Sequence, residues 1–225
     1  MGSPRPGPRR RDVIAAAAAV AAAAATTSLA TAPGPLKTAI LVDDQATLID
    51  FAGAWQALCD AQSDVGFEVY TVAPDLTPRR CYHDLILVPN HTFETAPAPD
   101  IILMGAQTGT RGATAAKLDW IRTRAATARL TASVCTGAFI LAQTGLLDGL
   151  SATTHHDFFD AFAARFPAIP VVRDRRIVDH GHIVTAGGES CSIDLGLFIV
   201  QRFYGRDVAQ ATARYMEFEG RSWLA

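Results

Sequence analysis

Cys135 stands between two segments that are expected to differ in secondary structure. Leu130–Val134 is predicted to be a buried strand, and a helix is predicted from Thr136 to Gly145. A thiol on such a turn projects over the edge of a sheet, and the helix N-terminus points at it. The partial positive charge there favours a thiolate, and free backbone N–H groups can stabilise an oxyanion. Cys135 is therefore a candidate nucleophile; a buried structural cysteine is the alternative.

Two further segments, Asp43–Asp50 and Met104–Gly112, also follow short apolar runs that are expected to be strands. Ligands of an open parallel sheet bind beyond the carboxyl ends of its strands, so these segments are expected to meet Cys135 there. Asp50 either partners the Cys135 thiol or lies near the start of the first helix and faces solvent.

Histidines occur in two close pairs, His155 with His156 and His180 with His182. Neighbours on a strand point to opposite faces, and the second pair falls on a predicted hairpin turn. We therefore expect no metal site and no cofactor.

These residues must be positioned by a chain in which strand-like and helix-like patterns alternate. The expected strands are 38–42, 67–73, 101–104, 130–134 and 152–155, with a hairpin over 176–185 that turns at His180-Gly181. The expected helices are 48–61, 113–124, 136–145, about 190–203 and about 208–217. This alternation predicts an α/β fold: a three-layer α/β/α sandwich, flavodoxin-like, with a mostly parallel sheet and a cysteine nucleophile elbow.

The composition of the 225 residues excludes some functions. The formal net charge is -2, so no basic field favours nucleic acid. A mean hydropathy of +0.17 suggests a membrane protein at first, but much of it lies in the 13-residue run Val13–Ala25. That run is too short to span a bilayer.

Residues 1–32 have the parts of a secretory leader. Basic residues precede the apolar run, and Ala30-Thr31-Ala32 is a small-residue cleavage site. The segment Arg10-Arg11-Asp12-Val13-Ile14 is typical of a twin-arginine signal. We expect a periplasmic or secreted protein, exported by the twin-arginine machinery, with no stable membrane insertion and one mature domain over 33–225. An alanine-rich extension is the alternative.

The three other cysteines are expected to be structural. Cys59 is predicted to lie in the core on the apolar face of its helix, Cys81 in a loop and Cys191 at the start of a helix. A disulfide between Cys59 and Cys81 is conceivable in an exported chain, but folding before export makes it unnecessary.

Several motifs together resemble the ThiJ/PfpI superfamily, with its class I glutamine amidotransferase-like fold, and its isonitrile hydratase and AraC-type sensor branch. The similarity runs from about Thr38 to about Tyr215. The motifs are Leu48–Gly53, Gly105–Thr110, Ser133–Ala138, Gly145–Gly149, Ala152–His155, Ala186–Gly188 and Ile193–Leu195.

The resemblance implies a role for each matching residue. Cys135 corresponds to the nucleophile, and Asp50 to an acidic partner that holds or relays a proton. The backbone N–H groups of Thr136 and Ala106 would form the oxyanion hole, with the Thr136 hydroxyl assisting proton transfer. His155 matches a histidine found near the cysteine in many members. These roles suit covalent catalysis on a small-molecule electrophile.

Some positions depart from the family pattern. Peptidase and deglycase members usually carry His directly after the cysteine or an early glutamate, where this chain has Thr136 and Asp50. The sequence contains no downstream His-x-Glu pair that a glutaminase needs. The usual Pro-Gly-Gly loop is Met104-Gly105-Ala106 here, which weakens the expected oxyanion hole if Ala106 cannot adopt a glycine-like conformation.

Three functions follow as expectations. The first is an isonitrile hydratase-like enzyme. The second is an extracytoplasmic ligand-binding module; regulators with such a domain carry a helix-turn-helix after it, whereas this sequence ends at Ala225. The third is a glyoxalase, deglycase or chaperone-like stress protein. The superfamily commonly dimerises, so a homodimer is a further expectation.

Overall fold

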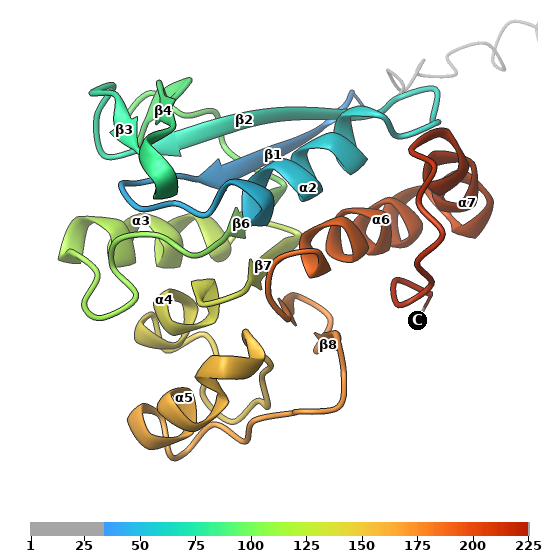
Figure 1. Cartoon of the computed structure of the whole chain (residues 1–225). Helices are drawn as coiled ribbons and strands as arrows, with labels where there is room; N and C mark the ends of the chain where they lie inside the picture. The colour runs from blue at the N-terminus through green and yellow to red at the C-terminus, as the bar shows by residue number, and fades with distance from the viewer. Residues whose placement is uncertain (1–33, 225) are drawn as a thin grey trace, which may run out of the picture. The chain divides into compact units, whose positions relative to one another are not determined.

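A computed structural model describes residues 34–224, and a seven-stranded sheet lies at its centre (Figure 1). The strands occur in the order β5-β2-β1-β6-β7-β9-β8, and their neighbours pair in parallel except for β8 with β9. Their bounds are β1 Leu36–Leu41, β2 Phe67–Ala73, β5 His91–Thr92, β6 Ile101–Met104, β7 Leu130–Val134, β8 Ile177–Asp179 and β9 Ile183–Ala186. A separate antiparallel pair consists of β3 Arg79–Arg80 and β4 Ile86–Leu87.

Helices cover both faces of this sheet, as a mostly parallel sheet requires. One layer holds α2 Leu48–Cys59, α6 Cys191–Tyr204 and α7 Arg206–Tyr215. The other holds α3 Ala115–Ala125, α4 Gly137–Gln143 and α5 Phe159–Arg165. Two short 3-10 helices, η1 Tyr82–Asp84 and η2 His156–Phe158, lie in the connections. Figure 1 shows α2 running beside α6 and α3 beside α4.

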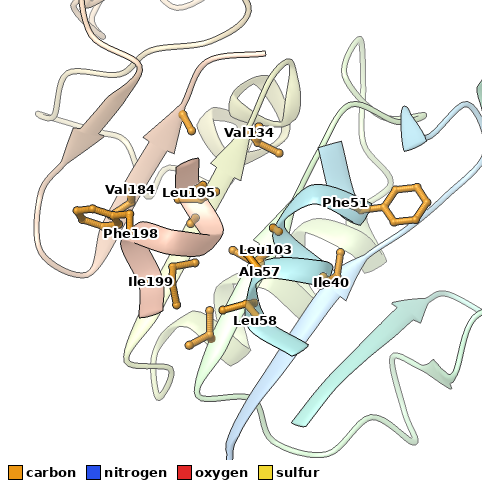
Figure 2. Close-up of a cluster of buried hydrophobic side chains, with 14 of the residues drawn as sticks. Ile40, Phe51, Ala57, Leu58, Leu103, Val134, Val184, Leu195, Phe198 and Ile199 are labelled. Carbon is orange, nitrogen blue, oxygen red and sulfur yellow. The ribbon is translucent and has the colours of Figure 1, made fainter. Parts of the chain in front are cut away.

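Alternating side chains along the strands divide the core into two clusters. In β1, Ile40 packs in the cluster with α2 and α6, whereas Ala39 and Leu41 pack in the cluster with α3 and α4. In β6, Leu103 and Met104 separate in the same way. Figure 2 shows the first cluster, in which side chains of α2 and α6 meet those of the sheet. Burying each large aliphatic side chain contributes about 1.5–3 kcal/mol, so these clusters hold the strand ends in register.

The predicted α/β sandwich and its main elements are confirmed. The strands at 67–73, 101–104 and 130–134 have the predicted bounds, and the hairpin turns at Gly181, whose φ is 79°. The short elements β3, β4, β5, η1, η2 and α5 were not predicted from the sequence. No helix among residues 34–224 is long and apolar enough to cross a membrane.

Two details of the sequence analysis are wrong. Residues 152–155 form no strand; Ala152 makes one isolated bridge to Val171 and the rest is loop. Cys59 is exposed rather than part of the core, although Ala57 and Leu58 in the same turn of α2 are buried. All four cysteines are free thiols, so no Cys59–Cys81 disulfide is formed. The leader expected at 1–32 lies outside the described residues.

Candidate active site

Cys135 occupies a tight turn between β7 and α4. Its φ is 58°, in the left-handed region that a non-glycine residue enters at a cost of about 1–3 kcal/mol. Its N–H donates to the carbonyls of Ala186 at 3.2 Å and Gly187 at 2.9 Å. Its carbonyl accepts the Thr154 hydroxyl at 2.8 Å. These bonds hold the strained turn, so the predicted nucleophile elbow is confirmed.

Gly137 allows α4 to start this close to the neighbouring strand. A Cβ at this position would lie 2.3 Å from the carbonyl oxygen of Met104, the last residue of β6. No side chain fits at such a distance, so the sequence can continue from Cys135 into a helix only with glycine here. The preceding Thr136 is buried at the N-terminal end of α4.

Asp50 faces Cys135 from the first turn of α2. Its side chain is buried, with 1% of the residue exposed. The Ala106 N–H donates to Oδ2 at 2.9 Å, and the Glu189 N–H donates to Oδ1 at 3.2 Å. A hydrogen bond also links the carboxyl to the Cys135 thiol. The structure therefore brings Asp50 and Cys135 together as expected, and excludes the solvent-facing alternative for Asp50.

Burial changes the ionisation of both groups. It raises the pKa of Asp50 from 3.8 to about 6, against the hydrogen bonds from Ala106 and Cys135, which lower it. It also raises the pKa of Cys135 from 9.0 to about 12, with the charge of Asp50 as the second cause. The Thr136 and Glu189 N–H groups oppose this rise without reversing it. The helix end favours the thiolate as predicted, since the Thr136 N–H lowers the pKa, but burial and the Asp50 charge outweigh it and favour the protonated thiol.

The expected oxyanion-hole donors have different positions from those that the sequence suggested. The Ala106 N–H donates to Asp50, and the φ of Ala106 is not positive. The Thr136 N–H faces the Cys135 sulfur. In this arrangement Ala106 fixes the carboxyl, whereas Thr136 is the donor beside the reacting atom.

His155 is close to the site but is not hydrogen-bonded to the cysteine. It is the residue before η2, and its Nδ1 accepts the Asp157 N–H at 3.2 Å. Its ring packs on Gly188, where a Cβ would lie 2.1 Å from Cδ2 of the ring. No hydrogen bond joins His155 to Cys135 or Asp50 among the described residues. His155 therefore lines the cavity next to the site and is not a direct partner of the thiol.

A cavity of about 380 Å³ lies next to residues that hold the pair, although neither Cys135 nor Asp50 lines it. It shares Thr154, Gly187 and Glu189 with the immediate surroundings of Cys135 and Asp50. Its other lining residues are Thr153, His155, His156, Phe159, Arg173, Asp174, Arg175, Arg176, Gly188, Ser190 and Cys191. A second cavity, against Asp50 and the core, has no volume open to water. A small ligand can therefore approach from the first cavity.

Comparison with known proteins identifies the family to which this architecture belongs. A model described as the DJ-1/PfpI family matches residues 36–202. The chain belongs to the DJ-1/PfpI family. It is 37% identical over 185 residues to an isonitrile hydratase from Pseudomonas putida, covering 81% of this chain and 78% of that protein.

The chain is also similar to two other proteins. The HTH-type transcriptional regulator GbdR from Pseudomonas aeruginosa is 27% identical over 189 residues; the match covers 82% of this chain but only 51% of the regulator. The crystal structure of a ThiJ/PfpI family protein from Pseudomonas syringae superposes with a TM-score of 0.74 at 30% identity, covering 84% of this chain and 77% of that one.

Within this DJ-1/PfpI domain, two contributors were missed or assigned differently. Glu189 was not among the predicted site residues, yet it donates its backbone N–H to Asp50, from a residue whose φ is 53°. Thr154, which holds the Cys135 carbonyl, was quoted only as part of a motif. Its position in that motif was the only feature of the sequence that could have indicated this role.

The DJ-1/PfpI domain also places the adjacent histidines differently from the prediction. His155 and His156 do not lie on a strand, and their rings stack with centroids 4.5 Å apart. The argument that they point to opposite faces is therefore wrong. With Asp157 they offer three ligand atoms that all lie within 4.8 Å of one another.

Proposed function

We propose that this protein hydrates isonitriles to N-substituted formamides, with Cys135 as the nucleophile and Asp50 as the proton carrier. The observation that carries the proposal is the buried Asp50–Cys135 pair, in which the carboxyl is hydrogen-bonded to the thiol and has a pKa of about 6. A base that titrates near the working pH can both accept and return a proton. The 37% identity to an isonitrile hydratase supports the same reaction.

The first step uses the proton that the pair already holds. Asp50 takes the thiol proton while sulfur bonds to the terminal carbon of R–N≡C. Asp50 then delivers that proton to the same carbon, giving the thioimidate R–N=CH–S–Cys. One carbon–nitrogen π bond is consumed, and C–S and C–H bonds form. Because no carbonyl is attacked, this step creates no oxyanion, and the Ala106 N–H can remain on Asp50.

The second step uses water from the cavity. Water bonds to the thioimidate carbon, Asp50 takes one of its protons, and the nitrogen receives it, giving R–NH–CH(OH)–S–Cys. The C–S bond then breaks, the hydroxyl proton passes through Asp50 to sulfur, and R–NH–CHO leaves. The thiol and carboxylate are restored. The Thr136 N–H stabilises charge on sulfur in both steps, since it faces that atom.

Formamide production from an alkyl isonitrile tests this proposal. Cys135→Ser and Asp50→Asn are expected to lower kcat/KM at least about a hundredfold, because each removes a participant in proton or nucleophile transfer. Cys59→Ser is the matched control, since that thiol is exposed on α2. Absence of formamide from the unmodified protein, or full activity of Cys135→Ser, would exclude the proposal.

A second candidate is a ligand-binding module that performs no chemistry. It is favoured by the Cys135 pKa of about 12, which keeps the thiol protonated, and by the similarity to a regulator over 51% of that protein's length. Small ligands should then raise the thermal midpoint equally in the unmodified protein and in Cys135→Ser. A shift that needs the thiol would instead favour the enzyme.

A further inference from the structure

Three consecutive side chains at the start of η2 point to a second function at the rim of the cavity next to the Cys135 site. We propose that His155, His156 and Asp157 bind a divalent transition-metal ion at the rim of the 380 Å³ cavity. None of these residues is required to touch Cys135 or Asp50. The inference therefore stands or fails separately from isonitrile hydration.

The spacing of the ligand atoms suits one ion. His156 Nε2 lies 3.2 Å from Asp157 Oδ1, and His155 Nδ1 lies 3.9 Å from Asp157 Oδ2. Ligands bonded to tetrahedral zinc at about 2.0–2.1 Å stand about 3.3–3.4 Å from one another. The two observed separations bracket that value, and rotation of the exposed His156 and Asp157 side chains out of the ring stack would bring one atom of each onto a shared ion. The hydrogen bond from the Asp157 N–H to Nδ1, at 3.2 Å, is long and can be given up.

The turn that creates this arrangement is fixed by its surroundings. The His155 ring packs against Gly188, and the two imidazole rings stack at an interplanar angle of 22°. The Phe158 N–H donates to the His155 carbonyl at 2.9 Å. The position of the His155 ring is therefore fixed, whereas the exposed His156 ring is free to leave the stack and turn its nitrogen toward an ion.

Charges near the cluster favour a cation. Asp174 and Glu189 line the same cavity, and neither has an ion pair in the described part of the chain. Arg175 there is also without an ion pair, so it offsets only one of these two carboxylates.

The two remaining arginines of that cavity are already neutralised. Arg173 pairs with Asp160 and Arg176 with Asp194, each at 2.6 Å. Neither therefore adds a free positive charge that would repel an ion.

The donor set indicates which ion would bind. Two imidazoles and one carboxylate suit Zn²⁺, Co²⁺, Ni²⁺ or Cu²⁺ better than Mg²⁺ or Ca²⁺, which prefer oxygen. The side chains of His156 and Asp157 are 76% and 70% exposed, which gives an ion access from solvent. Three protein ligands leave a further coordination position open to water or to a ligand in the cavity.

Titration of the tag-free, metal-stripped chain with Co²⁺, followed by its visible absorption, tests the site, and Zn²⁺ competition then ranks the ions. We expect one Co²⁺ per chain. His156→Ala and Asp157→Asn should each weaken binding at least about tenfold, since even indirect partners of metal ligands contribute that much. Both side chains are exposed, so circular dichroism should show that the variants fold.

His83→Asn is the matched control. It removes an exposed imidazole from η1, and asparagine tolerates the φ of 58° found there. Its Co²⁺ affinity should equal that of the unmodified chain. Absence of saturable Co²⁺ binding, or equal binding by His156→Ala, Asp157→Asn and His83→Asn, would overturn the proposal.

Discussion

Replacing Asp50 by asparagine is expected to stabilise the fold at neutral pH while it abolishes turnover. Burial raises the pKa of this carboxyl from 3.8 to about 6, so ionised Asp50 destabilises the native state. At about 1.4 kcal/mol for each tenfold change, that rise corresponds to about 3 kcal/mol at pH 7.5. Asparagine removes this cost but cannot accept from both the Ala106 and Glu189 N–H groups. Losing one of those bonds costs about 1–2 kcal/mol.

The net expectation is a gain of about 1–2 kcal/mol, or about 2–8 °C in Tm for a domain of this size. The sign depends on pH. Because the native pKa of Asp50 is raised, its protonated form stabilises the fold fully below pH 3.8, and this stability is lost as the pH rises through about 6. The advantage of the variant should therefore shrink by about 2 kcal/mol between pH 7.5 and pH 4.

Urea unfolding at both pH values measures this difference. Asp194→Asn is the control, because Asp194 is equally buried but pairs with Arg176 at 2.6 Å. Burial also raises the pKa of Asp194, but the same substitution there leaves Arg176 without its carboxylate partner, so any gain in stability should be smaller than that of Asp50→Asn. The reasoning is refuted if Asp50→Asn is less stable than the unmodified protein at pH 7.5, or if its advantage does not change with pH.

The remaining predictions concern activity, loop anchoring and export. Isonitrile turnover should fall with a one-proton dependence below about pH 6, because protonated Asp50 can no longer accept the thiol proton; a flat kcat/KM profile from pH 5 to 8 would contradict this. Lys117→Met should destabilise the domain by about 3 kcal/mol in urea unfolding, because buried Lys117 binds Asp43 at 2.7 Å and that charge would be left without its closest partner. Replacing Arg10 and Arg11 by lysine should abolish export in a secretion assay, and normal secretion would exclude the twin-arginine route.

Local signals were sufficient for the framework of the fold. The β-branched and aromatic residues of β2 and the apolar run of β6 gave the correct strand bounds, because short buried strands are determined by side chains that are neighbours in sequence. The turn at Cys135 was predictable for the same reason. It follows from a strand that ends at Val134 and a helix that can begin only at a small residue, Gly137.

Interactions between distant segments were not predictable in this way. The effect of the helix end on the thiol pKa was predictable because it is adjacent in sequence, whereas the larger opposing effects of burial and of the Asp50 charge come from the folded core. The Ala106 N–H was expected to face a substrate, yet it faces a carboxyl 56 residues away. The histidine pair was misplaced because Ala152–His155 has the pattern of a strand but forms only a single bridge, from Ala152 to Val171.

The order of the central strands has a consequence for folding kinetics. Asp50 follows β1, Ala106 follows β6, Cys135 follows β7 and Glu189 follows β9, and these four strands are spatial neighbours. The bond from Glu189 to Asp50 closes a loop of 139 residues. Contacts between residues so far apart in sequence form late in folding, because the entropy cost of closing the long loop between them must first be overcome. Recovery of enzymatic activity during refolding should therefore lag behind the recovery of helical signal, and would report completion of the whole domain.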